Sequence, residues 1–276
     1  MMRLAKMVAM ISCGVALTGC FQVERVVTVK PDGSGTVEET MLLSKKALAA
    51  MTSAFGNGQQ QQTQQQQTDD FDLVKEDDLK KAAAAMGEGV RYLKSSKISD
   101  EKFVGYRVVY AFNDINKLLV DKGPPKMEGQ PGVVDASKAA QFSFTPGSPA
   151  TLVIKGGMGE HKVAAPKTEE ASPAPAGEPN PQDMAMLKEM FDGMRFAMSV
   201  VVDGNIIKTN ATHREGNRII LADVDFSKIL SMPEKDLARL KDLNLKDGDM
   251  DAAMAVLREF PGMKVDLNDE VRVTFK

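Results

Sequence analysis

Alternation of apolar and polar positions is the clearest pattern in the chain after residue 20. From Phe21 to Lys30 the chain alternates with the period of a strand that has one buried face. One face has Phe21, Val23, Val27 and Val29, and the other has Gln22, Glu24, Thr28 and Lys30. Pro31-Asp32-Gly33-Ser34-Gly35 follows, and its Pro and Gly residues favour a turn. Thr36 to Leu43 alternates again, so we predict an antiparallel hairpin directly after residue 20.

The same signals predict further strands along the chain. We expect them at residues 90–98, 103–112, 141–145, 151–155, 195–202, 205–212, 218–226, 263–267 and 270–275. The three strands between 195 and 226 are expected to form a meander. The strands at 141–145 and 151–155 are short and apolar as a pair, so they need a partner sheet to cover them.

Helices are expected where apolar residues recur at helical spacing between suitable end signals. The predicted positions are 44–56, 77–86, 114–120, 184–193, a segment beginning at Ser231, and 249–260. The segment at Ser231 begins with Ser-x-x-Glu, the pattern of a capping box. The expected fold class is therefore α+β, a mainly antiparallel sheet with helices packed on one face.

Two long segments interrupt the pattern of strands and helices. The Gln-rich loop 57–70 and the Pro/Ala-rich loop 164–182 have few large apolar residues to bury, so we expect both to be disordered inserts. Residues 20–276 are expected to form a single α+β domain. The alternative is a pair of subdomains, 20–160 and 183–276, divided at the second insert.

The first twenty residues have the features of a secretory signal. Arg3 and Lys6 are positively charged, and the largely apolar run Met7 to Leu17 has the length of a signal-peptide core. Leu17-Thr18-Gly19-Cys20 resembles the bacterial lipobox. This resemblance implies removal of residues 1–19 by cleavage between Gly19 and Cys20. An ordinary secretory signal is the alternative, since the run is too short for a transmembrane helix.

The lipobox also implies that the Cys20 thiol is acylated. An N-terminal cysteine with two or three acyl chains anchors a soluble body stably to a membrane. We therefore expect a palmitate-type anchor in the cell membrane or outer membrane, with the body facing the periplasm or the exterior. Phe21 rather than Asp follows Cys20, which favours the outer membrane if the source is an enterobacterium-like Gram-negative bacterium.

Charge and composition narrow the function. The formal charge of −3 becomes −5 when Arg3 and Lys6 leave with the signal, and this mild acidity argues against nucleic acid as a partner. Cys13 also leaves and Cys20 is acylated, which excludes disulfides, thiolate metal sites and cysteine catalysis. The chain has no Trp and 3 Tyr residues, so stacking platforms for bases or sugars are not expected.

Histidine and carboxylate chemistry has few candidates. His161 and His213 both lie in turn-like contexts and are expected to be solvated surface residues. Asp223 and Asp225 share one face of a predicted strand, and paired carboxylates can perform acid–base or metal chemistry. Because Ile220, Ala222, Val224 and Phe226 alternate with that face, we interpret it as the solvent face.

Two further motifs favour ordinary structural roles. Asp247 to Asp251 is similar to a calcium loop, but Arg258 stands where an EF-hand has its bidentate Glu, so a helix start is expected. Gly156-Gly157-Met158-Gly159 lacks the Gly-Lys-Ser/Thr ending of a phosphate-binding loop and is expected to be a hairpin turn. We expect neither a metal ion nor a cofactor.

Methionines cluster around residue 190. They are Met184, Met186, Met190, Met194 and Met198. Thioethers bind copper(I), but such sites usually add histidine or cysteine, so filling of the apolar core is the expected role. Lining a lipid-sized cavity is the alternative.

The lipobox, the immediate strand, the Pro-Asp-Gly-Ser-Gly-Thr turn and the second strand together resemble uncharacterised bacterial lipoproteins of the LppM type. The segment from Met198 to Phe226 is similar to the same group. The resemblance covers about a third of the chain and implies a helix-grip or START-like domain associated with lipid or glycolipid binding. The two inserts depart from the group, and the C-terminal membrane helix expected of it is missing here. None of the group's ligand-contacting residues maps to a motif here.

These expectations describe a membrane-anchored envelope lipoprotein without enzymatic activity. The leading hypothesis is binding of lipid or another apolar ligand. The second is a structural or assembly lipoprotein that binds an envelope protein partner. The third, an envelope hydrolase, would need a cleft in which Asp223, Asp225 and a histidine meet.

Overall fold

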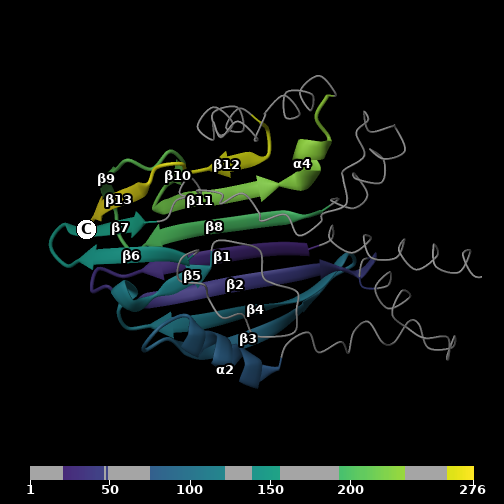
Figure 1. Cartoon of the computed structure of the whole chain (residues 1–276), viewed down its shortest axis with the longest axis horizontal. Coiled ribbons are helices and arrows are strands. Elements are labelled where there is room, and N and C mark those ends of the chain that lie inside the picture. The colour runs from purple at the N-terminus through teal and green to yellow at the C-terminus, as the bar shows by residue number, and fades with distance from the viewer. Residues whose placement is uncertain (1–20, 47, 49–74, 122–138, 156–192, 234–259) are drawn as a thin grey trace, which may run out of the picture.

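The computed structural model describes residues 21–46, 48, 75–121, 139–155, 193–233 and 260–276. These residues form two β-sheets (Figure 1). Sheet A contains β1 (Phe21–Val29), β2 (Gly35–Ser44), β3 (Arg91–Ser99), β4 (Phe103–Phe112), β8 (Arg195–Val202), β10 (Arg214–Glu215), β11 (Arg218–Asp225) and β12 (Met263–Val265). Sheet B contains β5 (Leu119–Asp121), β6 (Ala139–Thr145), β7 (Ala150–Lys155), β9 (Ile206–Thr209) and β13 (Glu270–Phe275).

The strand order in sheet A is β10-β11-β8-β1-β2-β4-β3, with β12 paired to β11, and the order in sheet B is β5-β6-β7-β13-β9. The pairing of β1 with β8 is parallel, while the other pairs are antiparallel. Each sheet combines strands from both sides of residues 164–182.

The predicted first hairpin is confirmed, and its turn fixes the register of β1 against β2. Lys30 N donates to Ser34 O at 2.8 Å, while the Asp32 carboxylate accepts from Ser34 N at 2.9 Å. Gly33 has φ of 82°, a conformation that favours glycine. The resulting register pairs Val29 with Gly35 and continues without interruption to the far end of both strands.

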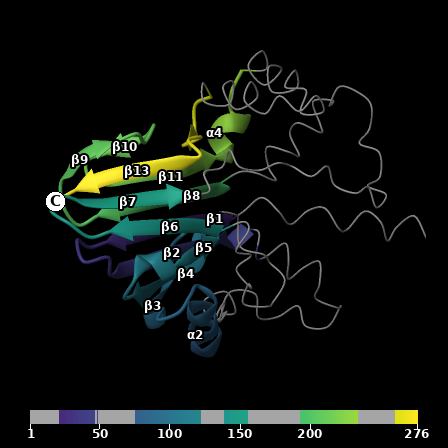
Figure 2. The same ribbon diagram turned by 60° about the vertical axis from the view of Figure 1, so that its left-hand side comes forward.

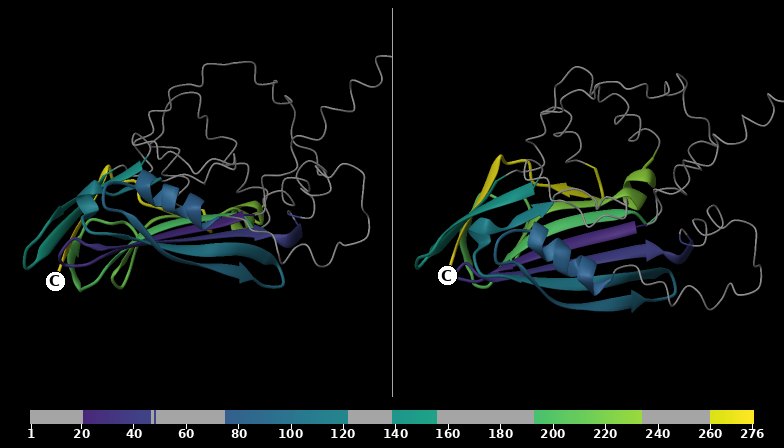
Figure 3. Two further views of the ribbon diagram at one scale, coloured as in Figure 1. Left: turned by 90° about the horizontal axis from the view of Figure 1, so that it is seen from below. Right: turned by 60° about the horizontal axis from the view of Figure 1, so that its bottom comes forward.

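Sheet B covers one end of sheet A (Figures 1 and 2). This is the end at which β1 finishes and at which the C-terminus of the chain lies. Phe112 and Ile115 join Val27 of sheet A to Leu152 and Phe275 of sheet B in one apolar cluster. Sheet B and α2 (Glu76–Ala85) lie on the same side of sheet A (Figure 3). We call this side the inner face of sheet A and the opposite side the outer face.

The predicted α+β class, with helices packed on one face of a sheet, is wrong. Strands predominate among the described residues, and a second sheet covers the end of sheet A. The reason is that the short apolar strands β6, β7 and β13 pair with one another and bury their apolar residues against sheet A. The described helices are α2, α4 (Phe226–Leu230) and the 3₁₀ turn η2 (Ile115–Lys117).

The helix predicted at residues 114–120 is also wrong. The Asp114 side chain accepts from Asn116 N and closes the single turn of η2. Leu118 is then extended, with ψ of 134°, so the chain enters β5 and passes from sheet A to sheet B. The hydrogen bond from Asn116 N to the Asp114 side chain therefore favours a single turn over a longer helix.

The segment 195–226 is not a meander. β8 pairs directly with β11, whereas β9 between them leaves for sheet B and pairs with β13. Reciprocal hydrogen bonds between Asn205 and Lys276, at 2.7 and 3.1 Å, hold this crossing in place. Ser231 is the C-cap of α4, and the helix predicted to begin there lies, from residue 234 onwards, outside the described residues. The helix predicted at 77–86 is confirmed as α2, with Leu79 and Ala83 buried.

Candidate functional site

A charged pair interrupts the apolar inner face of sheet A. Arg25 belongs to the inward-facing positions of β1, between the fully buried Val23 and Val27. The hairpin register places Arg25 directly opposite Glu39 of β2. The Arg25 and Glu39 side chains are only 8% and 19% exposed. A buried guanidinium requires such a partner, because an unpaired charge in an apolar layer is costly.

Arg25 also connects the two sheets. Its Nε donates to Glu39 Oε2 at 2.6 Å, and its Nη1 donates to the backbone oxygen of Asp121 at 2.9 Å. Asp121 is the last residue of β5, the edge strand of sheet B. The pair therefore lies at the boundary between the part of the inner face that sheet B covers and the part beyond it.

Two tyrosines of β4 lie close to this pair. Tyr106 is opposite Met41, which follows Glu39 on the same face of β2. The Tyr106 hydroxyl donates to Met41 Sδ at 3.5 Å. Tyr110 lies further along β4, opposite Val37. Burial, reinforced by the charge of Glu39, raises the pKa of both tyrosines well above the usual value. We call Arg25, Glu39, Tyr106 and Tyr110 the inner polar cluster.

The inner face is apolar between this cluster and the beginning of β1. We call this region the apolar half-face; it consists of Phe21, Val23, Met41, Leu43, Val104 and Phe196. Leu48 and Leu79 belong to the same apolar cluster. The strands of sheet B do not extend over this half (Figures 1 and 2). All of the half-face side chains except the half-buried Met41 are nevertheless buried, so this apolar region, which ends at a polar group, is covered in the folded chain.

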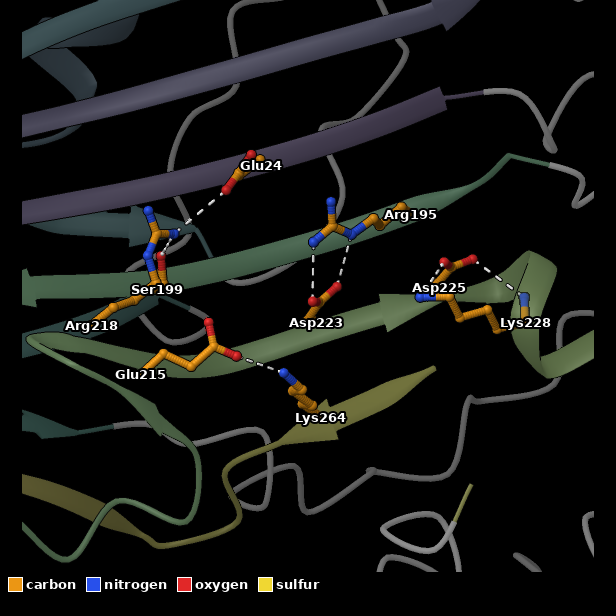
Figure 4. A network of polar contacts seen from close by, with 9 residues as sticks. All are labelled: Glu24, Arg195, Ser199, Glu215, Arg218, Asp223, Asp225, Lys228 and Lys264. Carbon is orange, nitrogen blue, oxygen red and sulfur yellow. Dashed lines mark hydrogen bonds and ion pairs between the residues drawn. The ribbon is translucent and has the colours of Figure 1, made fainter. Parts of the chain in front are cut away.

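The outer face of sheet A has a different arrangement of charges, shown in Figure 4. Arg195 Nε and Nη2 donate to the two carboxylate oxygens of Asp223 at 2.9 and 3.0 Å. Arg218 Nη1 donates to Ser199 Oγ at 2.8 Å and lies 3.5 Å from Glu24 Oε1.

The outer series continues towards β12 and α4. Lys264 Nζ lies 2.8 Å from Glu215 Oε1, and Lys228 Nζ lies 3.3 Å from Asp225 Oδ2. We call these four ion pairs (Glu24–Arg218, Arg195–Asp223, Glu215–Lys264 and Asp225–Lys228) the outer charge ladder. It joins β1 and β8 to β11, β10 to β12, and β11 to α4.

The predicted carboxylate pair belongs to this ladder. Asp223 and Asp225 share the outer face as expected, and each has a cationic partner. Asp225 also caps α4 by accepting from Lys228 N. The hydrogen bonds that Arg195 donates to the Asp223 carboxylate raise the pKa of Arg195. This arrangement pairs each carboxylate with a cation and ties β11 to β8 and to α4.

The predicted alternation around the two aspartates is wrong at Ile220. The register shifts between Ile220 and Ala222, so Ile220 lies opposite Ser199 and Ala222 opposite Met198. Leu221 is the extra residue of this bulge, and Ile220 consequently shares the outer face with Asp223.

His213 is not the solvated surface residue that the sequence predicts. It is half-buried, and its buried Nε2 has no hydrogen-bond partner within the part of the chain that the structure describes. The backbone before it is fixed, because Thr212 N donates to the buried Asp266 carboxylate at 2.8 Å. His161 lies outside the described residues.

Other predicted features also lie outside the described residues. They are Gly19, Cys20, both inserts, Gly156–Gly159, Asp247–Asp251, Met184, Met186 and Met190. Met198 is buried and lies beside Arg25 in the pairing of β8 with β1, while Met194 is half-buried against the core. Core packing is therefore the observed role of both described methionines of the cluster.

Metal-binding clusters and membrane-spanning helices are both absent from the described ranges. The described residues contain no group of three or more His, Cys, Asp or Glu side chains able to hold a metal ion. They also contain no helix with the length and apolarity needed to cross a membrane.

The inner polar cluster was missed by sequence reasoning, although the sequence carries a signal for it. Arg25 and Glu39 stand at inward positions of two alternating strands, and both are counted from one short turn. A hairpin register centred on residue 32 would have placed the two side chains opposite each other.

Comparison with known proteins gives one faint likeness. No family model matches the chain, and no curated protein matches it. The NMR structure of the folded domain of Mycobacterium tuberculosis LppM is similar over 74% of this chain and 81% of that chain, with 10% sequence identity and a TM-score of 0.29. A likeness of this size carries no argument about function.

Proposed function

We propose that this chain is the body of a membrane-anchored cell-envelope lipoprotein, held by acyl chains on Cys20, that binds lipid or another apolar ligand without catalysis. The observation that carries the proposal is the apolar half-face. It begins at Phe21, ends at the Arg25–Glu39 pair, and extends beyond the cover of sheet B. An apolar region that ends at a few fixed polar groups is typical of small-molecule sites. Because its side chains are buried in the folded chain, a ligand would enter it by displacing what covers them.

The length of this surface supports a lipid ligand. A strand rises about 3.3 Å per residue, so the distance along β1 from Phe21 to Arg25 is about 13 Å. The hydrocarbon core of a bilayer is about 30 Å thick, so an acyl chain in one leaflet spans about 15 Å. One acyl chain therefore matches the distance from the start of β1 to the polar cluster.

The position of the half-face supports the same conclusion. Phe21, its first residue, follows the predicted acylated Cys20 directly. An anchor at Cys20 holds this end of sheet A beside the bilayer, where lipid is concentrated. The polar cluster then lies on the far side of the half-face from the membrane.

The second candidate function is a structural or assembly role through the outer face. Sheet B and α2 both lie on the inner side of sheet A, which leaves the outer charge ladder facing away from them (Figures 3 and 4). Its Arg195 and Asp223 side chains are 41% and 24% exposed. A protein partner docked there would cover these ion pairs.

The test uses the absence of tryptophan from the chain. Met41→Trp and Leu42→Trp place one reporter on each face of β2 at neighbouring half-buried positions. We expect the fluorescence of the Met41→Trp chain to shift on addition of lipid vesicles, while that of Leu42→Trp stays constant. Native mass spectrometry of residues 21–276 secreted to a bacterial periplasm should show co-purified lipid. A clean apo mass and two silent reporters would favour the structural role.

A further inference from the structure

Strand β3 is a long strand at the edge of sheet A (Figures 1 and 3). It has nine residues, whereas the strands at the other ends of the two described sheet orders, β10, β5 and β9, have two, three and four. Natural proteins keep exposed edge strands short, because the backbone groups along an edge can pair with another chain. The other three edges follow this rule, and β3 departs from it.

The edge formed by β3 is open to solvent. β3 pairs with β4 on one side, and among the described strands none pairs with its other side. Residues 93–97 are all exposed, although α2 packs nearby. Leu93 is 47% exposed, which is unusual for a large apolar side chain of the described residues.

The regular part of β3 begins at Lys94. The register against β4 shifts between Tyr92 and Lys94, so Leu93 is the extra residue of a bulge. From Lys94 opposite Val109 to the end of the strand, the register continues without interruption. A bulge twists an edge away from an approaching chain. Another strand can therefore add to β3 along residues 94–99.

The charge of β3 restricts what can add there. Its charged residues are Arg91, Lys94 and Lys97, and it has no acidic residue. The nearby segment 75–85, which contains α2, adds no net charge, since it has three acidic residues and three lysines. A second copy of this chain would bring the same cations beside one another, which disfavours self-pairing. Acidic side chains on a partner strand would instead be attracted, because opposite charges across two strands stabilise their pairing.

The positions of the two lysines define the partner more closely. Lys94 lies opposite Val109 and Lys97 lies opposite Tyr106, so the lysines are three residues apart on the regular part of the strand. Side chains three residues apart on a strand point to opposite faces of the sheet. A partner strand in register with β3 meets both lysines when it carries acidic residues at positions i and i+3.

We propose that residues 94–99 form a strand-addition site for an extended segment of a partner protein with acidic side chains at positions i and i+3. The partner backbone continues the hydrogen-bonded ladder of sheet A, and its two carboxylates lie opposite Lys94 and Lys97. This inference goes beyond the proposed lipid binding and does not depend on it. It also differs from a partner on the outer face, since the contact is made along the edge of the sheet.

The experiment uses three dye-labelled peptides that differ only in charge. The first is Thr-Val-Glu-Thr-Val-Glu-Thr-Val, and the others have Gln or Lys in place of both Glu residues. Fluorescence polarisation with the full-length chain at low ionic strength measures binding. We expect the Glu peptide to bind at least about fivefold more tightly than the Gln peptide, from two cross-strand charge pairs. The bound Glu peptide should also slow amide hydrogen exchange in residues 91–99. Equal binding of the two peptides, no binding, or slowed exchange only elsewhere would overturn the proposal.

Charge reversal tests the assignment to β3. Lys94→Glu with Lys97→Glu changes two exposed side chains and should transfer the preference to the Lys peptide. Lys155→Glu with Lys208→Glu makes the same change at exposed positions of sheet B and should leave the preference for the Glu peptide intact. A Glu preference that survives the first pair of substitutions, or is lost with the second, would refute the site.

Two other occupants of this edge have distinct outcomes. If vesicles with anionic lipid bind, the peptides do not, and reversal at Lys94 and Lys97 abolishes the vesicle binding, the cations contact a membrane surface and the strand proposal fails. If light scattering shows a dimer that the same reversal dissociates, the edge is an interface between two copies of this chain, and the proposal fails as well.

Discussion

Sheet A carries an arginine–carboxylate pair on each face, and the two pairs differ mainly in their surroundings. Arg25 and Glu39 lie between apolar residues, with side chains 8% and 19% exposed. Arg195 and Asp223 lie on the outer face, 41% and 24% exposed. Both pairs join neighbouring strands at hydrogen-bonding distance. The same chemistry is therefore present both in the interior and in contact with water.

This difference determines what each pair does. In the interior, desolvation of two ions offsets most of their attraction, so the Arg25–Glu39 pair adds little net stability over an apolar pair of similar volume. The presence of this ion pair on an otherwise apolar face is better explained by a need for polar groups at this position of the sheet than by a gain in stability. On the outer face, water solvates each ion, and the Arg195–Asp223 pair adds a small stabilising term.

The largest expected effect comes from removing one member of the inner pair. Glu39→Gln removes the carboxylate that is paired with the buried Arg25 guanidinium, and we expect a loss of about 3–5 kcal/mol in the free energy of unfolding. Urea denaturation measures it. Arg25→Met with Glu39→Leu should restore most of this loss. A single substitution that costs no more than the same change at Asp223 would contradict the distinction between the faces.

A second expected effect is specific to high pH. Burial raises the pKa of Tyr106 and Tyr110 in the folded chain, while unfolded tyrosine titrates near about 10. The unfolded state therefore releases protons first, so this stabilising contribution is complete below about pH 10 and falls as the pH rises further. Denaturation midpoints across this range measure the effect. Tyr110→Phe should flatten the fall, and an unchanged slope would show that Tyr110 is not shielded.

The outer pair should respond weakly and in a salt-dependent manner. We expect Asp223→Asn to cost about 0.5–1 kcal/mol, because exposed pairs gain little and the bidentate geometry places this one near the upper end of their range. Added salt should shrink the difference between the variant and the parent chain. Denaturation at low and high ionic strength measures both. A loss unaffected by salt would place Asp223 in a more buried environment than the structure gives it.

Much of the strand pattern could be predicted because it depends on local alternation. The hairpin of β1 and β2 and the hairpin of β3 and β4 follow from period-two segments joined by short turns. The pairing of β1 with β8 and the departure of β9 into sheet B could not be predicted, because they depend on contacts between distant segments. The covering of sheet A by a second sheet instead of by helices could not be predicted for the same reason.

The candidate site could also be predicted only in part from the sequence. Asp223 and Asp225 were placed on one face by spacing alone, but their partners Arg195 and Lys228 become evident only from the strand pairing and the cap of α4. The Arg25–Glu39 pair was within reach of sequence reasoning through the turn register. Its contact with Asp121 was not, because β5 reaches Arg25 only through the crossing from sheet A to sheet B.

The smallest expected effect belongs to the most exposed rung of the outer charge ladder. The hydrogen bond and the charge of Lys264 lower the pKa of Glu215 below its ordinary value of 4.5. A lowered folded-state pKa means that the stabilisation is present above pH 4.5 and is lost as the pH falls through the folded value. The unfolding temperatures of the parent chain and Glu215→Gln should therefore differ slightly near neutral pH and converge in acid. A difference that persists in acid would assign the effect to packing, and one as large as that of Glu39→Gln would remove the contrast between the two faces.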